Sequence, residues 1–232
     1  MIANRSRQAG FTLIELLIAT TVFATVLLLS LAAVVQIGRM YYKGVTTSQT
    51  QQVARSILDE VSQSIQLGSI GITAANGSLD PSDATRVSAG FLCVGDLRYS
   101  YVINKQQSNP KDAAFGGSQS LHVLWADGVG NCASKAGASS VTLDRADPNG
   151  TGNPIASGGH ELLGAKMRLT RFVVAPLAGS TSLYKVQVSV VYGDDDLLTP
   201  PDATGRRACK GVYTGTQFCA ISELSTLVQK RI

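Results

Sequence analysis

The residues best placed to do chemistry are a glycine, a phenylalanine and a glutamate at the start of a long apolar run. Glu15 stands directly before Leu16–Val35, a stretch without a charged residue. An ionised carboxylate without a partner is costly in such surroundings, so a cation should accompany it. Cleavage after Gly10 would supply that cation, because the new α-amine of Phe11 would lie within a few residues of Glu15. The pattern would allow ion pairing with Glu15 if the chain were cut there.

The apolar run has the length of a membrane span. Its 20 residues, rising about 1.5 Å each in a helix, would cover a hydrocarbon core about 30 Å thick. Residues 1–10 include Arg5 and Arg7 and no acid, so the positive-inside bias should hold them in the cytoplasm. The sequence therefore predicts a single-pass membrane protein whose remaining residues form a head on the side of the membrane opposite residues 1–10.

This N-terminal pattern resembles the class III signal of type IV prepilins and pseudopilins. The resemblance implies that a prepilin peptidase cleaves after Gly10 and that the new N-terminus, Phe11, is methylated. It also implies that Glu15 pairs with the N-terminus of a neighbouring subunit in a filament. The expected partners are other pilin or pseudopilin subunits, the peptidase and the inner membrane.

Two simpler interpretations compete with this resemblance. A secretory signal peptide has an apolar region of about 7–15 residues, which is shorter than this run, and it has no use for a buried Glu15. A plain membrane anchor would explain the length of the run. It would explain neither the Gly10-Phe11 pair nor the glutamate, so the prepilin interpretation is favoured.

The rest of the chain offers little catalytic chemistry. His122 and His160 have no Cys, Asp or Glu at ligand spacing, and no G-x-S-x-G, P-loop or H-E-x-x-H motif occurs. Asp194 and Asp196 would suit calcium together with loop carbonyls, but a solvated turn is the favoured interpretation. We therefore expect no enzyme activity and no cofactor.

Four cysteines follow the apolar run, at a place where an oxidising compartment would favour two disulfides. Three connectivities are open from the sequence alone. The favoured one joins Cys93 to Cys132 and Cys209 to Cys219, because each bond would then close a separate loop. No spacing is C-x-x-C, so zinc binding and thioredoxin-like chemistry are disfavoured.

Charge gives little support to a nucleic-acid surface. The chain has 20 basic and 16 acidic residues, a net charge of +4, and loss of Arg5 and Arg7 with the leader would leave 18 basic residues. Arg206, Arg207 and Lys210 form one small basic cluster, for which a solvated loop is the favoured interpretation.

The elements that position these residues follow from periodicity. No proline occurs between Phe11 and Leu67, and apolar residues recur every four positions from Val53 to Ile65, so one helix is expected over 11–67. Its apolar half covers 11–37 and its amphipathic half 38–67. The head, 68–232, should begin with a loop over 68–90. Alternating residues then predict strands at 97–103, 121–125, 167–174, 183–192 and 224–232.

The predicted fold class is α+β, with a long transmembrane helix packed on an antiparallel sheet, as in type IV pilins. The strand followed by Tyr192–Asp196 and the terminal cysteine loop also resemble larger minor pilins of the PilW type. The expected function is a minor pilin that assembles in, or primes, a type IV pilus. A minor pseudopilin of type II secretion is the alternative, and an adhesin or DNA-uptake module is a rival of another class.

Overall fold

The computed structural model describes residues 10–68, 72–78, 88–94, 97–113, 122–128, 141–142, 159–202, 206–211 and 215–231. The chain divides into two compact units, Met1–Tyr42 and Lys43–Ile232. Helix α1, Leu13–Leu67, contributes residues to both units. It is a single 55-residue helix, and no proline interrupts it.

The second unit contains two sheets. The larger sheet has the strand order β5-β1-β2-β3-β4-β6, and its neighbours are antiparallel except for the short β1/β5 pair. Its strands are β1 (Ile72–Ser78), β2 (Ser88–Val94), β3 (Leu97–Val102), β4 (Leu124–Gly128), β5 (Val141–Thr142) and β6 (His160–Glu161). The short helix α2, Pro110–Ala113, lies between β3 and β4 in the chain.

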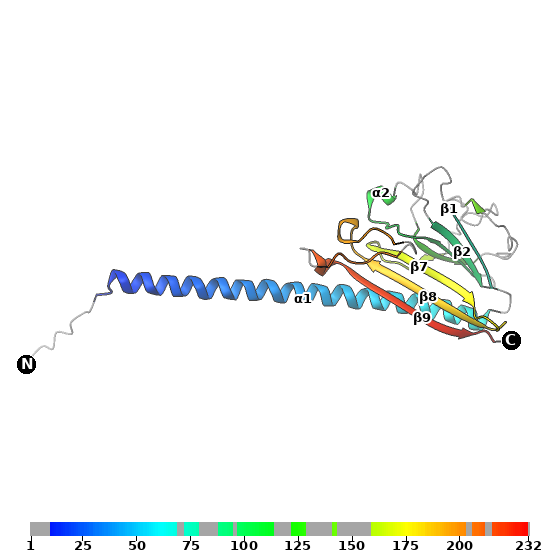
Figure 1. Cartoon of the computed structure of the whole chain (residues 1–232), viewed down its shortest axis with the longest axis horizontal. Helices are drawn as coiled ribbons and strands as arrows, with labels where there is room; N and C mark the ends of the chain where they lie inside the picture. The colour runs from blue at the N-terminus through cyan, green and yellow to red at the C-terminus, as the bar shows by residue number, and fades with distance from the viewer. Residues whose placement is uncertain are drawn as a thin grey trace, which may run out of the picture. The chain divides into compact units, whose positions relative to one another are not determined.

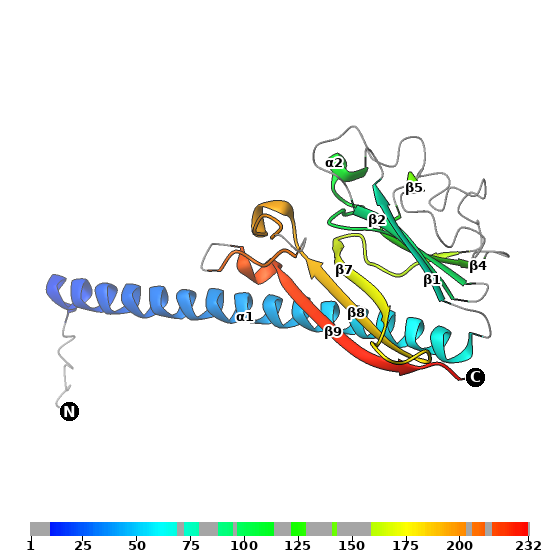
Figure 2. The same ribbon diagram turned by 45° about the vertical axis from the view of Figure 1, so that its right-hand side comes forward.

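The smaller sheet is fully antiparallel, in the order β7-β8-β9. Its strands are β7 (Met167–Pro176), β8 (Leu183–Tyr192) and β9 (Ala220–Gln229), with the 3₁₀ turns η3 (Asp195–Leu197) and η4 (Thr216–Phe218) between β8 and β9. A parallel bridge between Ile103 and Leu169 connects the two sheets. Figures 1 and 2 show the second half of α1 running along β8 and β9.

The core lies where this half of α1 meets both sheets. Helix residues at spacings of three and four are buried, the pattern of an amphipathic helix: Thr46, Thr50, Ala54, Ile57, Val61 and Ile65. The last four of these residues, Ala54 to Ile65, pack in one core cluster with Val186, Val188 and Val190 of β8 and with Tyr99 of β3. Tyr99 donates to or accepts from Ser64 Oγ at 2.7 Å. Burial raises the pKa of Tyr99 to about 12, although this hydrogen bond opposes the shift.

A buried ion pair joins two strands of the larger sheet. The guanidinium of Arg98 on β3 donates from Nε to Asp127 Oδ1 at 2.8 Å and from Nη2 to Asp127 Oδ2, on β4. The two residues are opposite each other in the strand register, and both side chains are fully buried. Their bidentate geometry satisfies charges that would otherwise be costly to bury.

The α+β class and the hairpin predicted from 167–174 and 183–192 are confirmed. The loop expected over 68–90 is wrong in part, because β1 and the start of β2 occupy it. Strand β1 pairs with β2, and β2 pairs with β3. These pairings outweigh the local preference of the segment for turns. The last strand begins at Ala220, four residues before the predicted start, because it pairs with β8 through Tyr192.

Candidate functional site

Glu15 and Thr12 form a capping box at the start of α1. Glu15 Oε2 accepts hydrogen bonds from the backbone N–H of Thr12 at 2.9 Å and from Thr12 Oγ1 at 2.8 Å. Thr12 Oγ1 in turn accepts from the backbone N–H of Glu15 at 3.3 Å. The spacing is the T-x-x-E signature of helix N-termini, which sequence reasoning missed because it treated Glu15 as a charge alone.

The predicted cleavage site precedes this cap. Gly10 and Phe11 are exposed and lie outside the helix, and a Cβ added at Gly10 would meet no atom within 4 Å. A peptide bond outside regular structure is accessible to a protease, whereas one inside a helix is not. Cleavage there would leave the amine of Phe11 directly before the Thr12 cap.

The first part of the helix that follows, from Leu16 to Val35, has exposed apolar residues on all sides. Among the described residues, α1 is the one helix long and apolar enough to cross a membrane, with a mean hydropathy of 2.4 over its best window. Its hydroxyls are satisfied within the helix, so they present no free donor to an apolar environment. Thr20, Thr21, Thr25 and Ser30 donate to the carbonyls of Leu17, Ile18, Val22 and Val26.

Polar and aromatic residues end the apolar segment. Arg39 is its first cation, and the rings of Tyr41 and Tyr42 are both exposed. Tyrosines and basic residues are the side chains that membrane interfaces favour. This boundary coincides with the end of the first compact unit at Tyr42.

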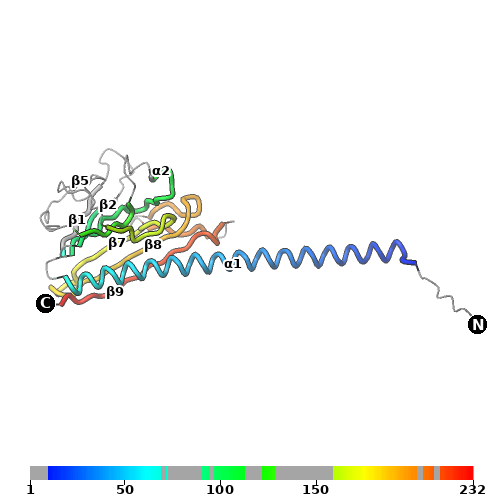
Figure 3. The backbone as a smooth tube through the Cα atoms, turned by 180° about the vertical axis from the view of Figure 1, so that it is seen from behind, coloured from blue at the N-terminus to red at the C-terminus, as the bar shows by residue number. Residues whose placement is uncertain are grey.

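The C-terminal disulfide loop holds α1 at the start of the second unit. Cys209 and Cys219 are disulfide-bonded, the pairing favoured from the sequence for these two residues. Lys43 Nζ donates to the carbonyls of Thr216 and Cys219, and Thr46 Oγ1 donates to the carbonyl of Gln217 at 3.2 Å. Figure 3 shows the loop from behind, beside the helix.

The second predicted disulfide lies partly outside the described residues. Cys93, on β2, is disulfide-bonded and 1% exposed. Cys132, its expected partner, is not among the described residues.

The three consecutive aspartates have different roles. Asp195 accepts from Arg207 at 2.6 Å and lies 3.1 Å from the guanidinium of Arg168, which is 1% exposed. Burial alone would raise the pKa of Asp195. The hydrogen bond from Arg207 and the positive charges of Arg168, Arg207 and Lys105 outweigh burial, so the pKa lies below its usual value.

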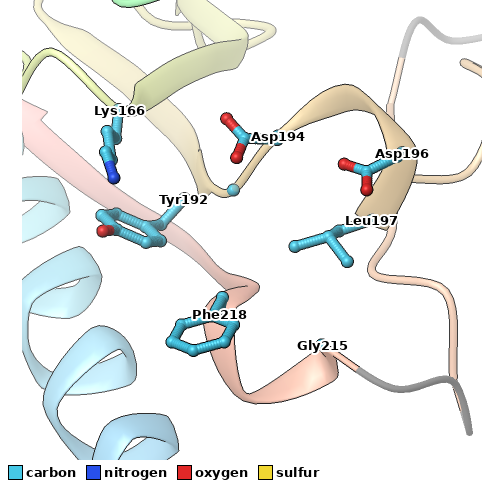
Figure 4. Close-up of a pocket in the computed structure, with 8 residues that line it drawn as sticks. Lys166, Tyr192, Asp194, Asp196, Leu197, Gly215 and Phe218 are labelled. Atoms are coloured by element: carbon cyan, nitrogen blue, oxygen red, sulfur yellow. The ribbon is translucent and has the colours of Figure 1, made fainter.

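The outer two aspartates line a hollow of about 300 Å³ with Tyr192 and Phe218. Figure 4 shows their carboxylates at separate points of its rim, across from Lys166. Gly193 and Gly215 form part of the lining at φ values of 132° and 104°, where other residues are disfavoured. Within the described part of the chain, no three His, Cys, Asp or Glu side chains are grouped to hold a metal. Calcium binding by Asp194 and Asp196 with loop carbonyls stays a hypothesis.

The side chains of the basic cluster and of the two histidines have partners among the described residues. Arg206 pairs with Glu223, Arg207 with Asp195, and Lys210 Nζ donates to the carbonyl of Asp196 at 2.8 Å. His160 Nε2 lies 3.6 Å from Glu60 Oε1 on α1. His122 stacks on Trp125 with ring centroids 4.0 Å apart, and its Nδ1 lies 3.5 Å from Glu161 Oε2.

A buried cluster around Arg168 was also missed from the sequence. Arg168 donates to Gln106 Oε1 at 2.7 Å, to the carbonyl of Asn104 at 3.1 Å and to Asp112 Oδ2 at 3.3 Å. It thereby fixes the segment after β3 against the start of β7. No local signal could have revealed it, because the partners lie about 60 residues away in the chain.

An exposed apolar N-terminal helix followed by antiparallel sheets matches the pilin fold. Residues 5–31 match the prokaryotic N-terminal methylation motif, which supports a type IV pilin-like or pseudopilin protein. The motif implies processing by a prepilin peptidase and assembly with other such subunits, and with the single apolar helix it fits a membrane-anchored protein. No curated protein and no solved structure matches the chain significantly.

Proposed function

We propose that this chain is a minor pilin, a structural subunit that co-assembles in, or primes, a type IV pilus. The prepilin peptidase cleaves it after Gly10, and Phe11 becomes the methylated N-terminus. The helix anchors the subunit in the inner membrane with the head in the periplasm until it enters the filament. Glu15 then sets the register by pairing with the amine of a neighbouring subunit.

The observation that carries the proposal is the start of α1. One carboxylate, that of Glu15, stands five residues after Gly10, in the first turn of a helix whose first part has exposed apolar residues on every side. Burial of these side chains among the helices of other subunits supplies the driving force, at about 25 cal/mol per Å² of apolar surface. A hydrophobic contact is non-directional, so a single charge pair at its end is what fixes the register.

The capping box gives the test its matched pair of variants. Glu15→Gln keeps a side chain that can cap the helix but removes the charge, whereas Thr12→Val keeps the charge and removes the hydroxyl. Glu15→Gln should be cleaved normally but lower incorporation into filaments at least about tenfold, because a desolvated amine left unpaired costs about 2–5 kcal/mol. Thr12→Val should be incorporated nearly normally.

Processing is followed by intact mass, and incorporation by the amount of the chain in sheared filaments. Normal incorporation of Glu15→Gln would contradict the register role. A stronger defect in Thr12→Val than in Glu15→Gln would assign the site to helix capping instead.

A type II secretion pseudopilin would share these N-terminal features. The two are separated by the phenotype of a deletion strain, since a pilin gene affects surface filaments and a pseudopilin gene affects release of secreted enzymes. An adhesin or a DNA-uptake module would need a ligand surface. Arg206, Arg207 and Lys210 do not provide one, because each is bonded within the head.

A further inference from the structure

The hollow of about 300 Å³ beside η3 and η4 combines charges of both signs with an aromatic surface. Asp194 and Asp196 contribute carboxylates, and Lys166 contributes an amine. Tyr192 and Phe218 contribute aromatic rings, and Phe218 is 44% exposed. The volume lies at the lower end of the range for small-molecule sites. This set of groups suits a small ligand that carries both a cation and an anion.

The three charged side chains of the hollow are available to a ligand. Among the described residues, none forms a hydrogen bond or an ion pair with the Lys166 amine or with the carboxylates of Asp194 and Asp196. Asp195, which stands between these two aspartates in the chain, is by contrast paired with Arg207. The head therefore satisfies the middle carboxylate internally and leaves the outer two facing the hollow.

The charges of opposite sign lie at different sides of the hollow. Figure 4 shows Lys166 and Tyr192 at one side and Asp196 at the opposite side, with Asp194 between them and Phe218 below. A ligand whose anion and cation are separated by a short apolar link can place its anion at Lys166 and its cation at the carboxylates.

The hollow lies beside the residues with which α1 enters the head. Lys43 Nζ donates to the carbonyl of Thr216 at 3.3 Å, and Thr46 Oγ1 donates to the carbonyl of Gln217 at 3.2 Å. Both carbonyls belong to η4, whose last residue is Phe218 of the hollow. The hollow and the first residues of α1 in the head are thus held together within one compact unit.

The same residues directly follow the apolar segment of α1. Arg39 is the first charged residue after that segment, and Lys43 comes four residues later, about 6 Å further along the helix axis. The headgroup layer on each side of a bilayer is about 5–8 Å thick. Continuity of the helix alone therefore brings η4 to the level of the lipid headgroups, whatever the direction of the head.

We propose that the hollow binds the headgroup of a phospholipid with a primary amine, phosphatidylethanolamine, from the leaflet on the side of the head. The ammonium of the lipid donates to the carboxylates of Asp194 and Asp196 and contacts the ring of Phe218. The phosphate accepts from Lys166 and from the hydroxyl of Tyr192. The inference rests on the membrane anchoring in the proposed function, and it adds a lipid that holds the head at the membrane surface before assembly.

The charges of the hollow favour this headgroup over other occupants. Phosphatidylglycerol brings no cation to Asp194 and Asp196, and phosphatidylcholine brings a cation without N–H donors. A basic side chain of another protein would satisfy the carboxylates but would leave Lys166 without an anion. The phosphoethanolamine group alone among these supplies N–H donors and an anion together.

Lipid retention by the unsubstituted full-length protein tests the site. The protein is reconstituted in bilayers with equal parts of phosphatidylethanolamine, phosphatidylglycerol and phosphatidylcholine, and native mass spectrometry identifies the lipids that stay bound. Phosphatidylethanolamine should be retained at least about tenfold more than either other lipid, because one charge-assisted hydrogen bond changes affinity by about this factor or more. Equal retention of the three lipids would overturn the inference.

Substitutions at the hollow separate its two ends. The double variant Asp194→Asn/Asp196→Asn should lose the preference for phosphatidylethanolamine, whereas Lys166→Gln should retain all three lipids about tenfold less, because each has a phosphate. Asp59→Asn, at an exposed position of α1, is the control and should behave as the unsubstituted chain. Formation of the Cys209–Cys219 bond shows that a variant has folded. A double variant that keeps the preference of Asp59→Asn would overturn the inference.

A soluble compound with the same headgroup separates the lipid from a free ligand. Glycerophosphoethanolamine added to the bilayers at millimolar concentration should leave the retained lipid unchanged, because the membrane supplies the lipid at a high effective concentration. Complete displacement of the lipid by this compound would assign the hollow to a soluble ligand and overturn the lipid assignment.

The proposed function and the lipid site fail in different ways, because the bilayer measurement needs no filament. If the chain is not a filament subunit, the unsubstituted protein is absent from filaments, yet its preference for phosphatidylethanolamine remains. If only the lipid site is wrong, the protein enters filaments and shows no such preference.

Discussion

At the scale of single residues, the carboxylate of Glu15 already has partners on its own helix. Thr12 satisfies it through a backbone N–H and a hydroxyl. We expect pairing with a neighbour's amine to compete with, or add to, this cap rather than to rescue a bare charge. A carboxylate accepts several hydrogen bonds, so both contacts fit one side chain.

The Arg98–Asp127 pair gives a prediction about stability. Asp127→Ala should lower the free energy of unfolding by about 3–5 kcal/mol, because it leaves an uncompensated guanidinium in the interior. The measurement is denaturant unfolding of the full-length chain in detergent. Asp59→Ala, at an exposed position of α1, is the control and should change stability by less than about 0.5 kcal/mol. Equal effects of the two substitutions would refute a structural role for the pair.

At the scale of elements, α1 is one helix with two environments. Residues before Lys43 are exposed almost without exception, whereas from Thr46 to Ile65 one side of the helix is buried in the head. A residue of the same type should therefore contribute differently to the free energy of unfolding of the head in the two halves. The head depends on the second half for its core, and the assembly proposed for this chain depends on the first.

Two isoleucines make this testable. Ile57→Ala should lower the free energy of unfolding of the head by about 2–5 kcal/mol, because it leaves a cavity at a fully buried position. Ile37→Ala, at a position that is 66% exposed, should leave head stability unchanged. Thermal unfolding of the full-length chain in detergent measures both. A loss at Ile37 that matches the loss at Ile57 would contradict the division of the helix.

At the scale of the whole molecule, the C-terminal disulfide loop contacts helix α1 and leads into β9, the last strand of the smaller sheet. The Cys209–Cys219 bond closes a loop whose carbonyls accept from Lys43 and Thr46. The loop thus fixes the point where α1 joins the head. Its bond requires an oxidising compartment, which connects the fold to the side of the membrane on which the head resides.

The oxidation state of Cys209 and Cys219 in cells therefore tests on which side of the membrane the head lies. Cys209 and Cys219 should resist alkylation in intact cells and react only after reduction, as expected for a periplasmic head. The double variant Cys209→Ser/Cys219→Ser should lose about 2–4 kcal/mol of stability. Mass spectrometry of alkylated peptides measures the first and denaturant unfolding the second. Alkylation of Cys209 without reductant would place the head on the reducing side.

The sequence by itself determined the features that depend on neighbours along the chain. Glu15, the apolar run after it and the four-residue recurrence of Val53–Ile65 define a helix with an apolar half and a packed half, because these signals are local. The alternation at 167–192 likewise predicted a hairpin. The Thr12–Glu15 cap could also have been predicted from the sequence, because its T-x-x-E spacing is local.

Tertiary structure alone decided the rest, because it depends on contacts between distant residues. Strands β1 and β2 form in a segment rich in turn residues since they pair with each other and with β3. Arg98 and Arg168 are buried because partners from other segments meet their charges. Strand β9 lies at one side of the smaller sheet, and the order of strands in a sheet cannot be predicted from one strand's own residues.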